Sequence, residues 1–155
     1  MAKKYLRILV PFDGSKYSER AINEGIEIAK KFGSKLYVIM AVATPIIEPP
    51  GMFFGYIRGV DMDKTFEDYT NIAYERAERI LQDVVEVCRK KGLEARYRVI
   101  SDKPGKAILD FSKRNDIGLI VMGSQGLRGI KKIKVLGSVS RHVLENAICP
   151  VLIVH

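Results

Sequence analysis

Cysteine and histidine, which build most transition-metal sites, are scarce in this sequence. The chain has two cysteines, Cys88 and Cys149, far apart in the sequence, and two histidines, His142 and His155. These four residues do not form a group with the ligand spacing of a zinc site. We therefore expect two buried thiols rather than a disulfide or a redox pair, and no transition-metal site. His142 is expected at the surface rather than as a catalytic base.

Long hydrophobic runs are also missing. No apolar segment approaches the roughly 18 residues that a membrane-spanning helix requires. The first residues do not show the apolar core and cleavage site of a secretory signal. The sequence therefore predicts a cytoplasmic protein with no membrane partner.

Positive charge is in excess, with 26 Lys and Arg against 18 Asp and Glu and a formal net charge of +8. Such an excess is typical of proteins that bind nucleic acid. However, the basic residues are spread over predicted helix faces, often beside Glu. The densest group has no aromatic side chain on which a base would stack; it comprises Arg128, Lys131, Lys132 and Lys134. We expect a solvated basic surface and no nucleic-acid partner.

The order of apolar segments predicts an α/β fold. Five strand-like runs cover residues 6–10, 36–42, 93–100, 117–122 and 151–154. Four helical patterns separate them, at residues 15–32, 64–91, 104–114 and from about Gly137 onward. We expect the third to bury Ala107, Ile108 and Phe111, and the last to present Val139, Val143 and Ile148 on its buried face. The second carries a long apolar stripe, formed by Phe66, Tyr69, Ala73, Ala77, Ile80, Leu81, Val84 and Cys88. Strands that alternate with helices form a parallel sheet with right-handed crossovers. For the 155 residues we predict one domain, Rossmann-like and doubly wound, with strand order 3-2-1-4-5 and helices on both faces.

The predicted topology places a ligand site beside the two central strands. In open α/β sheets, ligands bind outside the carboxyl ends of the strands where the strand order reverses. Residues 11–13 and residues 123–126 follow the two strands that meet there. Glycines let backbone N–H groups approach an anion, and the helix that Gly137 and Ser138 open adds free donors and a favourable dipole. These segments predict a phosphate-binding cradle and favour nucleotide binding.

Asp13 has two interpretations. Its carboxylate can accept hydrogen bonds from a ribose or help hold a hydrated metal, or the sequence Asp13-Gly14-Ser15 can serve as a turn and helix cap. The residue type alone does not separate these two roles.

The chain lacks the P-loop pattern, and no G-x-G-x-x-G follows the first strand, so neither of those nucleotide fingerprints applies.

A stretch without helical or strand periodicity covers residues 44–59 and includes Met52, Phe53, Phe54 and Tyr56. Loops of this length in compact domains are usually functional or disordered. The aromatic side chains favour a functional loop, which either covers the ligand or packs on a partner subunit. Of these two, packing on a partner is slightly favoured.

The glycine segments, together with Val10-Pro11-Phe12-Asp13-Gly14-Ser15 and the closing Cys149-Pro150-Val151-Leu152-Ile153-Val154, resemble the universal stress protein family over essentially the whole chain. The pattern is that of the ATP-binding branch, G-x-x-G, nine residues, then G-[ST]. Here ten residues, 127–136, stand between Gly126 and Gly137, and the additional Gly129 can absorb the extra residue.

The resemblance implies a bound ATP, ADP or AMP, with magnesium, and a set of contacts. Adenine would lie near Pro11, Phe12 and the main chain of Val42, and Asp13 would face the ribose or the nucleotide. The remaining implied binding residues are Met122, Gly123, Gln125, Gly126, Gly137, Ser138, Val139 and Ser140. Members of the family typically pair their last strands, which implies a homodimer through Val151–Val154, and a bare apolar edge of that kind needs covering.

Three functions follow from these features. The favoured one is a regulatory protein of the stress response, in which nucleotide occupancy is read by an unidentified protein partner. The first alternative is a slow ATPase or autokinase that uses Ser138 or Ser140. Because the sequence offers no convincing base and a single carboxylate, enzymatic activity is expected to be weak at most. The second alternative is a dimeric stress scaffold that binds no nucleotide.

Overall fold

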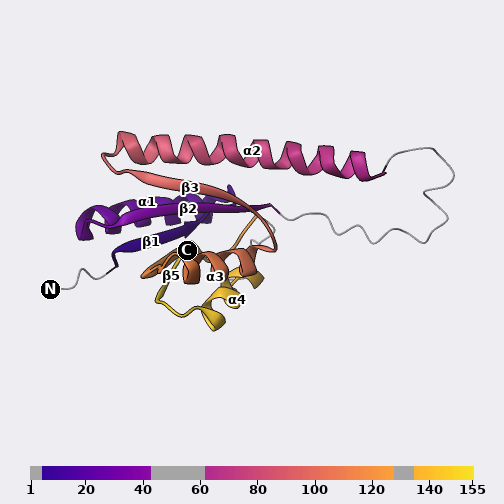
Figure 1. Cartoon of the computed structure of the whole chain (residues 1–155). Coiled ribbons are helices and arrows are strands. Elements are labelled where there is room, and N and C mark those ends of the chain that lie inside the picture. The colour runs from indigo at the N-terminus through magenta and orange to yellow at the C-terminus, as the bar shows by residue number, and fades with distance from the viewer. Residues whose placement is uncertain (1–4, 43–61, 128–134) are drawn as a thin grey trace.

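The chain forms a five-stranded parallel sheet with helices on both faces (Figure 1). The computed structural model describes residues 5–42, 62–127 and 135–155, with the side chains of residues 62–66 left out of the description. The elements are β1 (Arg7–Pro11), α1 (Lys16–Phe32), β2 (Lys35–Val42), α2 (Met62–Lys90), β3 (Ala95–Ser101), α3 (Pro104–Arg114), β4 (Leu119–Gly123), α4 (Ser138–Asn146) and β5 (Val151–Val154). The strand order β3-β2-β1-β4-β5 confirms the predicted order.

Alternation along the strands divides the interior into two cores. Ile8, Val10 and Val38 pack toward α1 and α2, whereas Leu9 and Ile39 pack toward α3 and α4. Successive strand residues point to opposite faces, so each central strand serves both cores. All five side chains are at most 1% exposed. Burial of this kind stabilises the fold by about 1.5–3 kcal/mol for each large aliphatic side chain.

Helix α1 is defined at both ends by its sequence. Ser15 caps it by accepting a hydrogen bond from the Ser18 N–H at 3.1 Å, and Gly33 ends it with a left-handed φ of 64°. Between them Gly25 faces β1, where a Cβ atom would lie 2.7 Å from Val10 Cγ2. This close approach sets the spacing between α1 and β1. Because only residues 12–15 separate the two elements, the N-terminus of α1 lies next to the end of β1 and therefore next to the predicted strand-end site.

Helix α2 is longer than its packing requires. Ala77, Leu81 and Cys88 are buried against the sheet, but Tyr69 is 65% exposed and Ala73 is exposed as well. We predicted a continuous buried stripe through Tyr69 and Ala73, and this was wrong because the N-terminal half of α2 runs past the sheet (Figure 1). Phe66, in the same predicted stripe, lies outside the described side chains.

The last crossover also differs from its predicted packing. Ile148 was expected on the buried face of the final helix, but α4 ends at Asn146 and Ile148 is 77% exposed. Val143 is fully buried, as predicted.

Among the described residues, no helix is both long and apolar enough to cross a membrane.

Candidate functional site

A pocket of about 560 Å³ opens at the carboxyl ends of β1, β2 and β4. This volume is typical of a small-molecule site. Its lining residues come from the strand ends, the segments that follow them and the first turns of α1, α3 and α4: Pro11, Phe12, Asp13, Ser18, Ile39, Ala41, Pro104, Ile108, Met122, Gly123, Gln125, Gly126, Leu127, Gly137, Ser138, Val139 and Ser140. The structure therefore brings together all the residues predicted from sequence except Val42.

Val42 lies at the end of β2, but its side chain packs with the core under α1 and α2. The residues of β2 that line the pocket are Ile39 and Ala41. Because strand residues alternate between faces, Val42 turns away from the site while Ala41 turns toward it. A contact through the main chain of Val42 stays a prediction.

One wall of the pocket was missed in the sequence. Pro104 and Ile108 come from α3, whose first turns cover the strand ends, and Leu127 follows the first glycine pair. Ile108 was recognised only as a core residue of its helix. The position of α3 over the strand ends depends on tertiary packing, which periodicity does not reveal. With Ile39 and Ala41, these residues give the pocket an apolar wall, which is typical of sites for small organic ligands.

Asp13 connects two chain segments that are far apart in sequence. Its Oδ1 accepts a hydrogen bond from the Ser15 N–H at 2.9 Å, and its Oδ2 accepts one from the Leu127 N–H at 3.2 Å. The first bond is the turn-and-cap role considered from sequence, and the second ties the end of β1 to the segment after β4. The carboxylate is exposed and lines the pocket, so it also faces any ligand bound there.

The first glycine pair has two structural tasks. A Cβ atom on Gly126 would lie 2.7 Å from Asp13 Oδ2, so this glycine makes room for the carboxylate beside the pocket. A Cβ atom on Gly123 would lie 2.7 Å from Tyr17 Cβ and 2.8 Å from the Tyr17 carbonyl carbon. Gly123 therefore permits α1 to pack closely on β4. Its backbone lines the pocket, but the requirement for glycine there arises from the fold.

The second glycine begins a helix that points into the pocket. The Gly137 N–H donates to the Ser124 carbonyl at 2.8 Å, which joins the helix start to the end of β4. Gly137 is the N-cap of α4 and provides no side-chain cap. The first N–H groups of a helix have no acceptor within it, so the N–H groups of Ser138, Val139 and Ser140 suit an anion.

The two serines of this turn differ in their environment. Ser140 is 3% exposed, and its hydroxyl donates to the Gly123 carbonyl at 2.9 Å. Ser138 is exposed and lines the pocket. Ser140 therefore fixes α4 to β4, whereas Ser138 presents its hydroxyl to a ligand.

Gln125 forms a hydrogen bond to the C-terminal end of the segment 127–136, which lies between Gly126 and Gly137. Its Nε2 donates to the Val135 carbonyl at 2.8 Å. The basic group predicted at Arg128, Lys131, Lys132 and Lys134, with Gly129, lies outside the described residues, as does the stretch 44–59. The bonds of Gln125 and of the Gly137 N–H join the end of β4 to the start of α4. They therefore fix the two ends of the segment 127–136 relative to each other.

The electrostatics of the pocket are simple. Of the described residues that line it, Asp13 alone has an ionisable side chain. Within the described part of the chain, no group of three or more His, Cys, Asp or Glu side chains is placed to hold a metal. A magnesium ion bound here would depend on phosphate and water oxygens with one carboxylate, which is the way Mg²⁺ commonly accompanies nucleotides.

The thiols and His142 lie apart from the pocket. Cys88 is buried and Cys149 half-buried, and burial raises the pKa of both thiols. Both are free cysteines, and the prediction of full burial holds for Cys88 alone. His142 is exposed on α4, as predicted, with Asn146 Nδ2 3.5 Å from its Nδ1.

Comparisons with known proteins bear on the same features. The chain matches the family model described as "Universal stress protein family" over residues 4–155. Universal stress protein YxiE of Bacillus subtilis is 31% identical over 157 residues, which cover 96% of this chain and 97% of YxiE.

Two solved structures show the same architecture. Universal stress protein UspA from Lactobacillus plantarum has a TM-score of 0.83 at 21% identity, covers 98% of this chain and 99% of its own, and supports the fold alone. The universal stress protein from Archaeoglobus fulgidus in complex with dAMP has a TM-score of 0.62 at 26% identity, with coverage of 98% and 99%.

Proposed function

Because this chain belongs to the universal stress protein family, we propose that it is a regulatory protein of the stress response that binds an adenine nucleotide in the strand-end pocket. The observation that carries the proposal is the pocket itself, which combines an apolar wall with the uncapped N-terminus of α4. The relative from Archaeoglobus fulgidus was solved with dAMP, an adenine nucleotide. The chemistry and the family point to the same ligand class.

Each part of the nucleotide has a matching part of the pocket. The base packs between Pro11 and the wall of Ile39, Ala41 and Ile108. The phosphates lie at the first turn of α4, where the N–H groups of Ser138 and Val139 donate to them. Asp13 faces the ribose, and magnesium, when bound with ATP or ADP, neutralises phosphate charge.

The proposal includes a homodimer formed through β5. Among the described residues, β5 is an edge strand that pairs with β4 alone, and Leu152 on it is 37% exposed. An edge of this kind is a template for pairing with another chain. In the proposed protein, which acts in the cytoplasm as one nucleotide-binding domain, occupancy of the pocket is read by a protein partner.

Phosphoryl transfer is the alternative activity of the same site. Ser138 is the acceptor that its exposure favours, because the Ser140 hydroxyl is buried and already bonded to the Gly123 carbonyl. No carboxylate besides Asp13 lines the pocket among the described residues, and no side chain there is placed as a general base. We therefore favour binding over efficient turnover.

The proposal is tested by calorimetric titration of nucleotide-free protein with ATP, ADP and AMP, with and without magnesium. We expect saturable binding near one nucleotide per chain, with a Kd on the order of micromolar to tens of micromolar. Absence of binding up to millimolar concentrations would favour the scaffold without nucleotide. Turnover of ATP that disappears in Ser138→Ala would favour the enzyme.

Two substitutions of different size at Gly137 test the proposed position of the phosphates, with Gly137→Ala as the control for Gly137→Val. A Cβ atom there would have its nearest contact at 3.4 Å from Gln125 Cα, so Gly137→Ala fits the fold. The additional methyl groups of Gly137→Val would crowd the backbone of Gln125 and Gly126, which lines the space proposed for the phosphates. We expect Ala to retain binding and Val to weaken it at least about tenfold, which corresponds to about 1.4 kcal/mol, with similar thermal stability in both. Equal affinities would contradict the position of the phosphates.

A further inference from the structure

The outer edge of β3, at the opposite end of the sheet from β5, has chemistry that the nucleotide pocket does not use. We propose that this edge binds an extended acidic segment of a partner protein, which adds a strand to the sheet beside Arg96 and Arg98. Among the described residues, β3 pairs with β2 and with no other strand. An edge strand presents unpaired backbone N–H and C=O groups, and addition of a strand there is a known mode of peptide recognition.

Arg96 and Arg98 give this edge its charge. They are two residues apart, opposite Tyr37 and Ile39 in the register of β2, and therefore project from the same face. Both are exposed. In the described part of the chain neither forms an ion pair, whereas Lys106 on the neighbouring α3 pairs with both Asp102 and Asp110. Two unpaired guanidinium groups thus stand along the edge.

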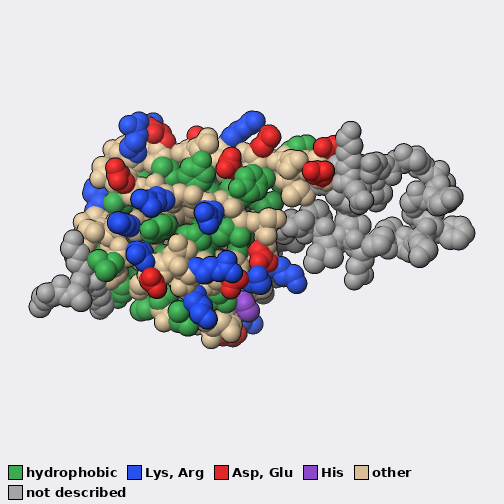
Figure 2. Space-filling model, viewed as in Figure 1, with side chains coloured by type: hydrophobic (Ala, Val, Ile, Leu, Met, Phe, Trp, Pro, Cys, Tyr) green, Lys and Arg blue, Asp and Glu red, His purple; other side chains and the backbone are tan. Residues whose placement is uncertain are grey.

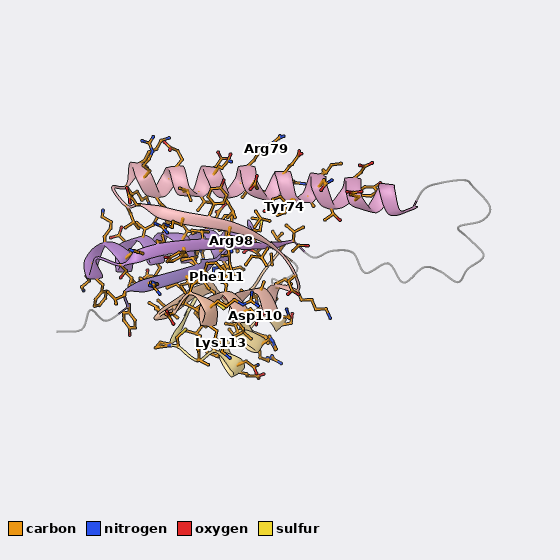
Figure 3. The ribbon with its side chains drawn as sticks, viewed as in Figure 1. Tyr74, Arg79, Arg98, Asp110, Phe111 and Lys113 are labelled. Atoms are coloured by element: carbon orange, nitrogen blue, oxygen red, sulfur yellow. The ribbon has the colours of Figure 1, made fainter. Side chains whose placement is uncertain are left out.

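The surroundings add to the positive potential and leave the edge accessible. Lys and Arg side chains gather over β3 in the band between α2 and α3 (Figure 2). Arg98 of β3 lies on the same side of the molecule as Phe111 and Lys113 of α3 (Figure 3). On this face the ring of Phe111 packs against Tyr37 of β2 with centroids 5.9 Å apart. Arg96 and Arg98, on the neighbouring strand, are nevertheless exposed, so α3 does not cover them.

The opposite face of an added strand would meet α2. Tyr74 lies on the stripe of α2 that carries Ala77 and Leu81, three and seven residues later, and both of those are buried against the sheet. Tyr74 itself is 39% exposed. An extended segment beside β3 can therefore place acidic side chains against the arginines on one face and apolar side chains beside Tyr74 on the other.

Charge selects an acidic segment over a second copy of this chain. If two copies paired their β3 strands in antiparallel fashion, the arginines of one would face those of the other, and like charges directly opposite are destabilising. Carboxylates at alternate positions of an added strand instead lie opposite Arg96 and Arg98 as charge-assisted pairs.

Aromatic exposure argues against single-stranded nucleic acid. Binding of that kind uses aromatic rings as stacking platforms along a basic strip. Here the rings on the same face as the arginines, Tyr37 and Phe111, are half-buried and packed on each other. Edge arginines also keep sheets from pairing at random. If the arginines served only to prevent such pairing, no peptide would bind.

The test uses a fluorescent peptide of about ten residues with Glu at alternate positions and Thr or Val between them. Two further peptides serve as controls, one with Lys in place of Glu and one with prolines that remove backbone donors. The variant Arg96→Gln/Arg98→Gln is compared with Lys30→Gln/Lys31→Gln, whose lysines are exposed at the end of α1. Each double variant lowers the net charge by two. Comparing them therefore distinguishes the effect of where the charges lie from the effect of the total charge.

We expect the Glu peptide to bind the unchanged protein and Lys30→Gln/Lys31→Gln alike, and to bind Arg96→Gln/Arg98→Gln about fivefold or more weakly, as the loss of two cross-strand charge pairs requires. The Lys peptide and the proline peptide should not bind. Binding of the proline peptide as tight as that of the Glu peptide, or equal loss in both variants, would overturn strand addition at β3. So would absence of binding to the Glu peptide, or tighter arginine-dependent binding of oligo(dT).

Discussion

Gly123 and Gly137 belong to one sequence pattern, yet the structure gives them different roles. Gly123 is required by the contact of α1 with β4, because any side chain would meet the backbone of Tyr17. Gly137 has room for a Cβ atom and starts the helix that faces the pocket. Sequence reasoning assigned both to the ligand, since a glycine pattern does not reveal what the missing side chain would have touched.

Substitution at Gly123 should therefore act on stability. We expect Gly123→Ala to lower the free energy of unfolding by about 1–3 kcal/mol, as overpacking against a rigid backbone does, measured by urea denaturation. Gly137→Ala is the control and should change the free energy of unfolding by roughly 0.5 kcal/mol or less. Equal stabilities for the two variants would show that β4 and α1 do not approach as closely as described.

The thiols offer a second test at the residue scale. Burial raises the pKa of both Cys88 and Cys149, so less of the reactive thiolate is present at a given pH than in the unfolded chain. We expect alkylation by iodoacetamide near pH 8 to be slow in the native protein and fast in urea, with Cys88 the slower of the two because it is fully buried. Native Cys88 that reacts as fast as the unfolded thiol would contradict its burial between α2 and the sheet.

Among the elements, α2 shows where sequence periodicity is not enough. Its apolar pattern continues through Tyr69 and Ile72, which are 65% and 63% exposed, while Leu81 is fully buried. The pattern identifies the helix, but the sheet ends before the helix does. Periodicity also identified each described strand, and the helix-length crossovers indicated a parallel sheet. Their order was predicted by placing the most apolar strands at its centre. The wall that α3 contributes to the pocket could not be read in the same way.

The two halves of α2 should respond differently to truncation. We expect Leu81→Ala to lower the free energy of unfolding by about 2–5 kcal/mol, because it removes a side chain from the core. Ile72→Ala should change it by roughly 0.5 kcal/mol or less. Urea denaturation measures both. A large loss of stability in Ile72→Ala would show that a part of the chain outside the described residues packs on this half of the helix.

The whole molecule has two sheet edges with opposite character. β5 is apolar, with residues Val151–Val154, and suits a second copy of the chain, whereas β3 carries Arg96 and Arg98 and suits an acidic partner. The proposed nucleotide pocket lies between them, at the centre of the carboxyl edge of the sheet. The sequence predicted this arrangement as far as the pocket and β5; the charged edge became apparent only once the register placed both arginines on an open face.

Dimerisation through β5 gives a test at this scale. Leu152→Asp would place like charges near each other across a two-fold strand pair, and we expect it to convert a dimer into a monomer. Light scattering after size exclusion measures the mass directly. The matched control is Leu144→Asp on α4, which is also a half-exposed leucine, at 46%. If both variants remain dimeric, the interface lies elsewhere.

The proposed position of the nucleotide is tested most directly by following backbone amide resonances during titration with ATP and magnesium. We expect saturable shifts at Ser138, Val139 and Ser140, whose N–H groups open α4, and at Met122, which lines the pocket. Amides of the exposed half of α2, such as Ile72, should not move. If ATP binds but leaves the α4 amide resonances unchanged, or if the shifts are confined to another surface, the nucleotide does not bind in the strand-end pocket.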